Sequence, residues 1–317
     1  MDIGMMISAH TGLTWERWLH VLPLAERLGF HSIFRTDHYF TAEQQNSLEA
    51  YVSLAVAARE TERIRFGPLV TPVTFRRPVD VGRMAAQIDL LSGGRFVMGL
   101  GAGWTEAEHV AYGVPFPPPR ERFDRLAEAI QLMRALWTEG PTDFDGKFYQ
   151  LKGADCLPKP ATGRPPILIG GVGERRTLRL VAQYADEWNA LNLTPEQFAA
   201  KSALLEKHCD DIGRDPATIR RSMNIFSIFG PSQEVVDAVT RRFMTSFPPD
   251  RPMKPGEYRN TAEGRGWLVG STDAVVDYLG RLAEMGLHEV QFPHMLLERD
   301  DFPEYVAAEI APKLAAL

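Results

Sequence analysis

The sequence has few cysteines, no long apolar run and no excess of basic residues. Cys156 and Cys209 are the only cysteines among 317 residues, and their wide spacing excludes a disulfide framework or a zinc knuckle. We therefore expect two free, buried thiols. No stretch approaches the roughly 18 consecutive apolar residues of a membrane span. Residues 1–7 have neither the basic region nor the apolar region of a secretion signal. These absences predict a cytoplasmic protein that does not contact a membrane.

The charge balance and the missing motifs exclude further classes of function. The chain carries 41 acidic and 35 basic residues, which gives a net charge of −6 and none of the basic character of a nucleic-acid binder. It also lacks a phosphate-binding P-loop, a His-Glu-x-x-His helix and a Gly-x-Ser-x-Gly elbow. Four histidines that could gather in the fold are not at ligand spacing, so no metal is predicted: His10, His31, His109 and His294. A small-molecule substrate is the expected partner.

Apolar segments of strand length alternate with amphipathic segments along the whole chain. The expected strands cover residues 2–8, 32–35, 64–70, 96–100, 167–169, 187–191, 222–229 and 289–292. The expected helices cover residues 15–28, 48–60, 78–91, 122–138, 174–184, 197–212, 233–243, 272–285 and 302–314. Such alternation is typical of parallel βαβ units, and eight strands in about 300 residues favour a closed barrel. We predict an α/β fold, a (β/α)₈ TIM barrel that forms one domain over residues 1–317.

Two stretches interrupt the alternation. Residues 107–121 contain four prolines, and residues 246–266 are rich in proline, glycine and charge. Long loops of this kind are usually functional. We expect both to be insertion loops at the C-terminal mouth of the barrel.

Because barrel enzymes place their active sites at the C-terminal ends of the strands, those ends supply the candidate residues. Asp37 and His38 follow the second strand and could provide a proton donor and a group that orients it. Neighbouring residues on an extended chain point to opposite sides, so we expect that Asp37 does not orient His38 directly. At the end of the third strand, the glycine and two prolines of residues 66–72 predict either a bulge with unusual backbone or a plain kink.

Two glycine-rich turns follow later strands. Residues 99–104 (GLGAGW) differ from a dinucleotide fingerprint in glycine spacing and in their position after the fourth strand. Gly101 and Ala102 are better suited to close approach of a flat ring or a substrate. Residues 170–176 (GGVGERR) open a helix, where backbone N–H groups and the arginines could bind phosphate. The alternative is a tight turn with a solvated basic face.

At these strand ends the sequence resembles the luciferase-like monooxygenase superfamily, and in particular its branch of deazaflavin (coenzyme F420)-dependent oxidoreductases. The matching segments occur in the expected order over nearly the whole chain: TDHYF (36–40), GRFVMGLGAGW (94–104), PKP (158–160), PILIGG (166–171), YADEWN (184–189) and WLVG (267–270).

The resemblance implies a TIM barrel that binds an isoalloxazine-type ring at its mouth, with His38 as the catalytic proton donor or stabiliser. It implies a cis-peptide bulge under the ring near Thr71, and a polar contact from Glu108. The implied cofactor-binding residues at the ring are Asp37, His38, Pro68, Leu69, Val70, Thr71, Gly101, Ala102 and Glu108. Those at the phosphate are Gly170, Gly171, Val172, Gly173, Glu174 and Arg175.

The leading expectation is an enzyme that transfers a hydride between coenzyme F420 and an unidentified small organic substrate. One alternative is an FMN-dependent monooxygenase of the same fold, supplied with reduced flavin by a partner reductase. Another is a non-catalytic flavin-binding barrel. Trp104 replaces the catalytic acid of the sugar-phosphate dehydrogenases in this family, which argues against glucose-6-phosphate as substrate. The family also implies a homodimer. The helix at 48–60 could supply its face through Tyr51, Leu54, Ala55 and Ala58, unless these residues simply pack on the barrel.

Overall fold

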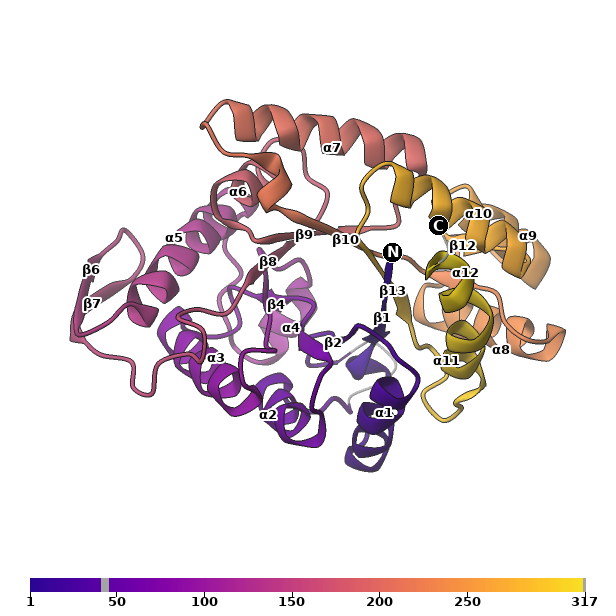
Figure 1. The fold of residues 1–317 in the computed structure, drawn as a ribbon, viewed down its shortest axis with the longest axis horizontal. Coiled ribbons are helices and arrows are strands. Elements are labelled where there is room, and N and C mark those ends of the chain that lie inside the picture. Colours follow the sequence, from indigo (N-terminus) through magenta and orange to yellow (C-terminus); the bar gives the residue numbers. More distant parts are fainter. Residues whose placement is uncertain (41–45, 316–317) are drawn as a thin grey trace.

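The computed structural model describes residues 1–40 and 46–315, and its centre is a ring of parallel strands (Figure 1). The strands of the main sheet follow the order β3-β2-β1-β13-β10-β9-β8-β5-β4. Their bounds are β1 (Asp2–Ile7), β2 (Ser32–Arg35), β3 (Arg65–Pro68), β4 (Thr71–Pro72), β5 (Met98–Gly101), β8 (Ile167–Gly170), β9 (Glu187–Leu191), β10 (Arg220–Asn224) and β13 (Glu289–Pro293). The ring closes where Phe66 pairs with Phe96. Since β3 and β4 are two parts of one barrel strand, the predicted (β/α)₈ barrel is confirmed.

Helices surround the ring and connect successive strands (Figure 1). They are α1 (Trp15–Arg27), α2 (Ala50–Glu60), α3 (Pro78–Ser92), α5 (Pro119–Trp137), α6 (Thr177–Tyr184), α7 (Pro195–Asp210), α10 (Thr272–Glu284), α11 (Asp301–Tyr305) and α12 (Ala311–Ala315). A π-helical segment, Val306–Ile310, joins the last two, and short 3₁₀ turns lie at Ala9–Thr11 and Pro216–Thr218. At the start of α7, Thr194 and Gln197 cap each other's backbone N–H groups. This reciprocal cap explains why α7 begins where it does.

Several expected boundaries were wrong, mostly in the insertions. The proline-rich stretch contains α4 (Glu106–Ala111) as well as the start of α5, and the second stretch contains α9 (Pro255–Glu263). The strand expected at 222–229 is split into β10 and β11 (Ser227–Ile228), and β11 pairs with β12 (Leu268–Val269) beside α8 (Gln233–Ser246). Helix α6 begins at Thr177 and not at Glu174, because no side chain caps it and the glycine turn runs on to Arg176. Proline and glycine end periodic patterns, but they do not prevent a short helix between them.

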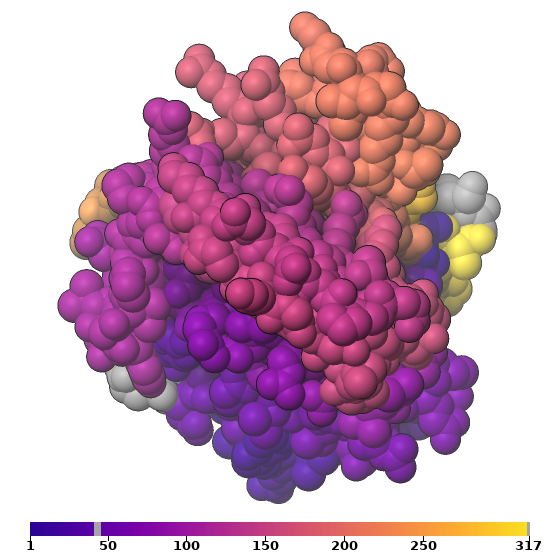
Figure 2. Space-filling view, turned by 90° about the vertical axis from the view of Figure 1, so that its left-hand side faces the viewer, coloured from indigo at the N-terminus to yellow at the C-terminus, as the bar shows by residue number. Residues whose placement is uncertain are grey.

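A hairpin was missed altogether. The strands β6 (Thr142–Asp145) and β7 (Gln150–Ala154) form a separate antiparallel pair after α5. Their side chains alternate between half-buried and exposed, so the apolar signal of this segment is weak. Figure 2 views the molecule from the side that carries the hairpin and shows the middle of the chain covering that side.

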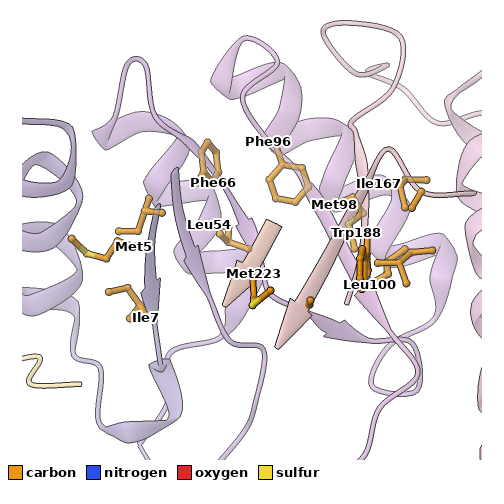
Figure 3. Packing of buried hydrophobic residues seen from close by; sticks show 14 of the residues in the cluster. Met5, Ile7, Leu54, Phe66, Phe96, Met98, Leu100, Ile167, Trp188 and Met223 are labelled. Atoms are coloured by element: carbon orange, nitrogen blue, oxygen red, sulfur yellow. The ribbon is translucent and has the colours of Figure 1, made fainter. Parts of the chain in front are cut away.

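The main core lies between the strands and the helices, and Met5, Leu54 and Trp188 are among the buried residues of this one large cluster (Figure 3). A second cluster fills the barrel interior with side chains from different strands: Met6, Phe34, Leu69, Val97 and Leu168. Both cysteines are free and buried, as predicted. Among the described residues, no helix has the length and apolar content needed to cross a bilayer.

Candidate active site

His38 lies at the C-terminal mouth of the barrel, three residues beyond the end of β2, and is paired with Glu108 of α4. The His38 Nδ1–Glu108 Oε2 distance is 2.7 Å. The other carboxylate oxygen, Oε1, accepts the backbone N–H groups of Tyr39 at 2.5 Å and Phe40 at 3.4 Å. The insertion after β5 therefore reaches back to β2 and fixes both the imidazole and the loop that carries it.

The electrostatics of this pair follow from its burial. The Glu108 side chain is completely buried, and burial by itself raises the pKa of a carboxyl group. The hydrogen bond and charge of His38, together with the two backbone N–H groups, outweigh that effect, so the pKa of Glu108 is lowered overall. An ionised carboxylate only accepts hydrogen bonds. His38 must then donate from Nδ1, which leaves its Nε2 without a protein partner among the described residues.

Asp37 faces a different network, as the alternation along the chain predicted. Its carboxylate accepts two hydrogen bonds from Arg76, at 2.7 and 3.1 Å, and one from Thr71 at 2.8 Å. The Thr71 hydroxyl also contacts Tyr51, while Arg76 contacts Glu49 at 2.6 Å. Burial alone would lower the pKa of Arg76, but the neighbouring Asp37 raises it overall. The polar atoms of Asp37 and Thr71 thus form hydrogen bonds within the protein. We infer that these two side chains stabilise the mouth of the barrel.

Two further side chains lie beside His38. The ring of His10, from the turn after β1, is 4.9 Å from the His38 ring between centroids, in an edge arrangement. The indole of Trp104 is 5.7 Å away and 73% exposed. The mouth therefore presents two imidazoles next to an open apolar surface.

The floor of the mouth is shaped by an irregular backbone between β3 and β4. The peptide bond between Leu69 and Val70 is cis, so the unusual backbone expected at residues 66–72 is present. The side chain of Val70 fills the space next to Gly101 of β5 and Gly170 of β8. A Cβ added at Gly101 or Gly170 would lie 2.6 or 2.9 Å from it, closer than side chains tolerate. Glycine at both positions therefore leaves room for the Val70 side chain at the mouth.

The turn that follows β8 has the features of an anion site. Gly171 is anchored through its N–H to Asn189 at 2.9 Å and through its carbonyl to the Trp188 indole at 2.8 Å. Among the described residues, the backbone N–H groups from Val172 to Arg175 have no acceptor. A Cβ at Gly173 would lie 2.8 Å from the Thr177 hydroxyl, so glycine keeps the turn open. The residues present fit a phosphate group.

The charged residues of the turn point to different partners. Arg175 is exposed, Glu174 accepts from Lys201 at 3.0 Å, and Arg176 lies 3.7 Å from Asp124. Arg175 is thus the arginine that remains available to an anion.

The four histidines considered for a metal do not gather. His31 lies with Asp2 and Glu289 at the opposite, N-terminal end of the barrel, and this is the only metal-like group found in the part of the chain that the structure describes. The carboxylates of that group already form ion pairs with arginines: Arg65 pairs with Glu289, and Arg220 pairs with Asp2 and Glu289. His109 bonds to Thr74 and Thr105, and His294 to Arg17.

Comparison with known proteins assigns the chain to a family. The sequence profile of the luciferase-like monooxygenases matches residues 1–289. The chain belongs to this family. It is also 30% identical to the F420-dependent glucose-6-phosphate dehydrogenase of Nocardia farcinica, over 100% of this chain and 99% of that protein. The match with the F420-dependent hydroxymycolic acid dehydrogenase of Mycobacterium tuberculosis is 28% identical and covers 86% of this chain and 77% of that one.

The luciferase-like fold is also found among solved structures. An F420-dependent secondary alcohol dehydrogenase superposes with a TM-score of 0.80 at 20% identity, covering 99% of this chain and 98% of that one. The monooxygenase RslO1 from Streptomyces bottropensis gives 0.81 at 21% identity, covering 98% and 99%. The predicted family is therefore confirmed, and this luciferase-like protein is an oxidoreductase.

The structure brings most predicted site residues to one end of the barrel. His38 and Glu108 are in contact, the Val70 side chain lies against Gly101 of β5 and Gly170 of β8, and the turn at 170–175 follows β8. Sequence reasoning missed His10 and Arg76 as members of the site. Their position after the first and third barrel strands was the available signal.

Proposed function

We propose that this luciferase-like protein transfers a hydride between coenzyme F420 and a small organic substrate, with His38 exchanging the accompanying proton. The observation that carries the proposal is the buried Glu108–His38 pair, which holds the imidazole at the barrel mouth and leaves Nε2 available. Two relatives that match 86% and 100% of this chain are named as F420-dependent dehydrogenases, which supports this choice of cofactor.

The protein's residues divide the work between binding and proton handling. Backbone N–H groups from Val172 to Arg175 would hold the cofactor phosphate at the start of α6. Val70, Gly101 and Ala102 would form the surface beneath the ring. Glu108 keeps His38 oriented and stabilises the imidazolium whenever Nε2 takes up a proton. When bound, a deazaflavin supplies the carbon centre that accepts or gives the hydride.

Cofactor titration tests the proposal. Purified protein is titrated with F420 and, separately, with FMN, while quenching of the cofactor fluorescence is followed. We expect saturable binding of F420 that is tighter than binding of FMN. Absence of saturable F420 binding would contradict the proposal.

A second candidate is an FMN-dependent monooxygenase that receives reduced flavin from a partner reductase. The proposed phosphate-binding turn at residues 170–175 (the phosphate turn) favours neither cofactor, because both F420 and FMN carry a phosphate. A partial match, 34% identical over 44% of this chain, is the pyrimidine monooxygenase RutA of Allorhizobium ampelinum. Tighter binding of FMN, with oxygen consumption on addition of reduced FMN, would support this candidate over the first.

We also propose a homodimer, although not through the residues first considered for it. Tyr51, Leu54 and Ala58 are buried against the barrel and Ala55 is half-buried, whereas Val52 on the outer side of α2 is 55% exposed. Val52→Glu should therefore convert a dimer to a monomer in light scattering. A wild-type protein that is monomeric at micromolar concentration would contradict the dimer.

A further inference from the structure

Leu191 is an exposed apolar side chain at the mouth to which the proposed function assigns no task. It is the last residue of β9, and 44% of it is exposed, whereas the four residues before it in the strand are buried. A leucine exposed on an outer surface is common and needs no explanation. Leu191 differs because its side chain points into the barrel, as the contacts of its own strand establish.

Side chains alternate along a strand, so residues 187, 189 and 191 share one face of β9. The Glu187 carboxylate contacts Arg65 of β3 at 2.8 Å, and β3 and β9 are not neighbours in the sheet. Asn189 donates a hydrogen bond at 2.9 Å to Gln291 of β13, which is not a neighbour of β9 either. Such side chains meet only across the barrel interior. Leu191 therefore faces the barrel axis at the open, C-terminal end.

The proposed function divides the mouth into two halves. The surface beneath the ring and the phosphate turn belong to β4, β5 and β8, which are consecutive in the sheet. The arc from β9 through β10, β13 and β1 to His38 after β2 remains for the substrate, and we call it the substrate half (Figure 1). Leu191 and His38 thus lie at the two borders of the substrate half.

The strand ends of the substrate half carry no lysine, arginine, aspartate or glutamate. The three residues that follow β9, β10, β13 and β1 are NLT (192–194), IFS (225–227), HML (294–296) and SAH (8–10). From outside the strands, Arg242 of α8 reaches the carbonyl oxygen of Thr11 at 2.7 Å. A phosphate or carboxylate placed against Leu191 would lose water without gaining a charged partner from these strand ends, which is costly. An alkyl or aryl group instead gains from leaving water.

We propose that Leu191 is a substrate-binding residue, and that the substrate belongs to the class of molecules with an alkyl or aryl group that packs on it. This role rests on the proposed function, because the place of the cofactor defines which half remains for the substrate. Leu191 selects the apolar group, whereas His38 exchanges the proton. Sugar phosphates, which are polar over most of their surface, do not belong to this class.

The first test needs no cofactor. Protein labelled with ¹³C at the leucine methyl groups is titrated with toluene and, separately, with glucose 6-phosphate, and Leu191→Ala identifies the Leu191 signal. We expect toluene to shift this signal in a saturable way and glucose 6-phosphate to leave it unchanged. Toluene that does not shift the signal, or glucose 6-phosphate that does, would overturn the proposal.

The second test measures how much Leu191 contributes to binding, with the signals of toluene itself as the readout. Leu191→Ala should weaken toluene binding about three- to tenfold, the factor expected from covering the exposed 44% of a leucine side chain. Leu191→Lys should weaken it at least as much. The matched control is Leu19→Ala, because Leu19 of α1 is also 44% exposed but lies outside the barrel, and this variant should bind toluene like the wild type. An equal loss in Leu19→Ala, or no loss in Leu191→Ala, would refute the role of Leu191.

F420 separates contact with the substrate from contact with the cofactor. With F420 bound, toluene should still shift the Leu191 signal, with a Kd no higher than in its absence. F420 that abolishes this response would overturn the proposal, because Leu191 would then belong to the cofactor half. Failure of the proposed function is recognised separately. In that case F420 shows no saturable binding, while the response of Leu191 to toluene persists.

Discussion

Replacing Glu108 should reveal how much one buried carboxylate at the barrel mouth contributes to the free energy of unfolding. Its oxygens accept three hydrogen bonds, from His38 and from the backbone N–H groups of Tyr39 and Phe40. A hydrogen bond to a charged group contributes about 1.5–3 kcal/mol. Glu108→Gln keeps an acceptor for the backbone but loses the charge, and its amide hydrogens face the His38 Nδ1–H. We expect the free energy of unfolding to fall by about 2 kcal/mol.

A double-mutant cycle isolates the contact with His38. Glu108→Gln, His38→Phe and the double variant are compared by equilibrium urea denaturation at pH 7. Because the two side chains touch, the interaction energy should be about 1.5–2 kcal/mol. His20→Gln combined with Glu108→Gln serves as a matched control and should be additive. An interaction energy below about 0.5 kcal/mol would refute the reasoning, since distant, independent sites show values of that size.

The same contact predicts a pH dependence with a definite sign. The pKa of Glu108 is lower in the folded protein than its usual value of about 4.3. The carboxylate therefore contributes its full stability above that usual value, and the contribution is lost as the pH falls through the lower, folded pKa. The stability difference between wild type and Glu108→Gln should therefore become smaller as the pH is lowered from 5. A difference that stays constant over this range would contradict the assignment.

Three other predictions concern neighbouring positions. His38→Ala should lower turnover about 10²–10⁴-fold with little change in cofactor affinity, and near-normal turnover in His38→Asn would reject proton transfer. Gly171→Asp, at a φ of 126° in the phosphate turn, should weaken cofactor binding by at least about 2 kcal/mol in titration. An unchanged Kd would place the phosphate elsewhere. Arg76→Met leaves the carboxylate of Asp37 buried and unpaired, and should cost about 3–5 kcal/mol in urea denaturation. A loss below about 1 kcal/mol would contradict that role.

Much of the architecture could be predicted because the barrel strands are continuous apolar segments separated by amphipathic helices. Thr194, Pro195 and Gln197 form a local cap that needs no tertiary contact, so the start of α7 is visible in the sequence, although the helix was expected from residue 197 and begins at Pro195. The β6–β7 hairpin and the short α4 and α9 were not. They are only partly buried, so neither leaves a clear apolar period in the sequence.

The candidate site was predicted as a set of positions but not as a set of contacts. The strand-end rule selects His38, and the family resemblance adds Glu108, yet nothing local indicates that residues 70 apart share a hydrogen bond. The contact between the rings of His10 and His38 was equally hidden, because the two residues follow different strands. Such details follow from packing between separate βα units, and a single sequence does not display them.

The contact of the Val70 side chain with glycines of two neighbouring strands has an evolutionary consequence. A side chain at Gly101 or Gly170 would collide with the Val70 methyl groups, so neither glycine can be enlarged while valine stands at position 70. Relatives with a smaller residue at position 70 are free to carry alanine or serine at the other two. Relatives with a larger residue must instead widen the barrel mouth. Covariation among these three positions would therefore track the shape of the surface on which we propose that the cofactor ring lies, separately from the residues that perform the chemistry.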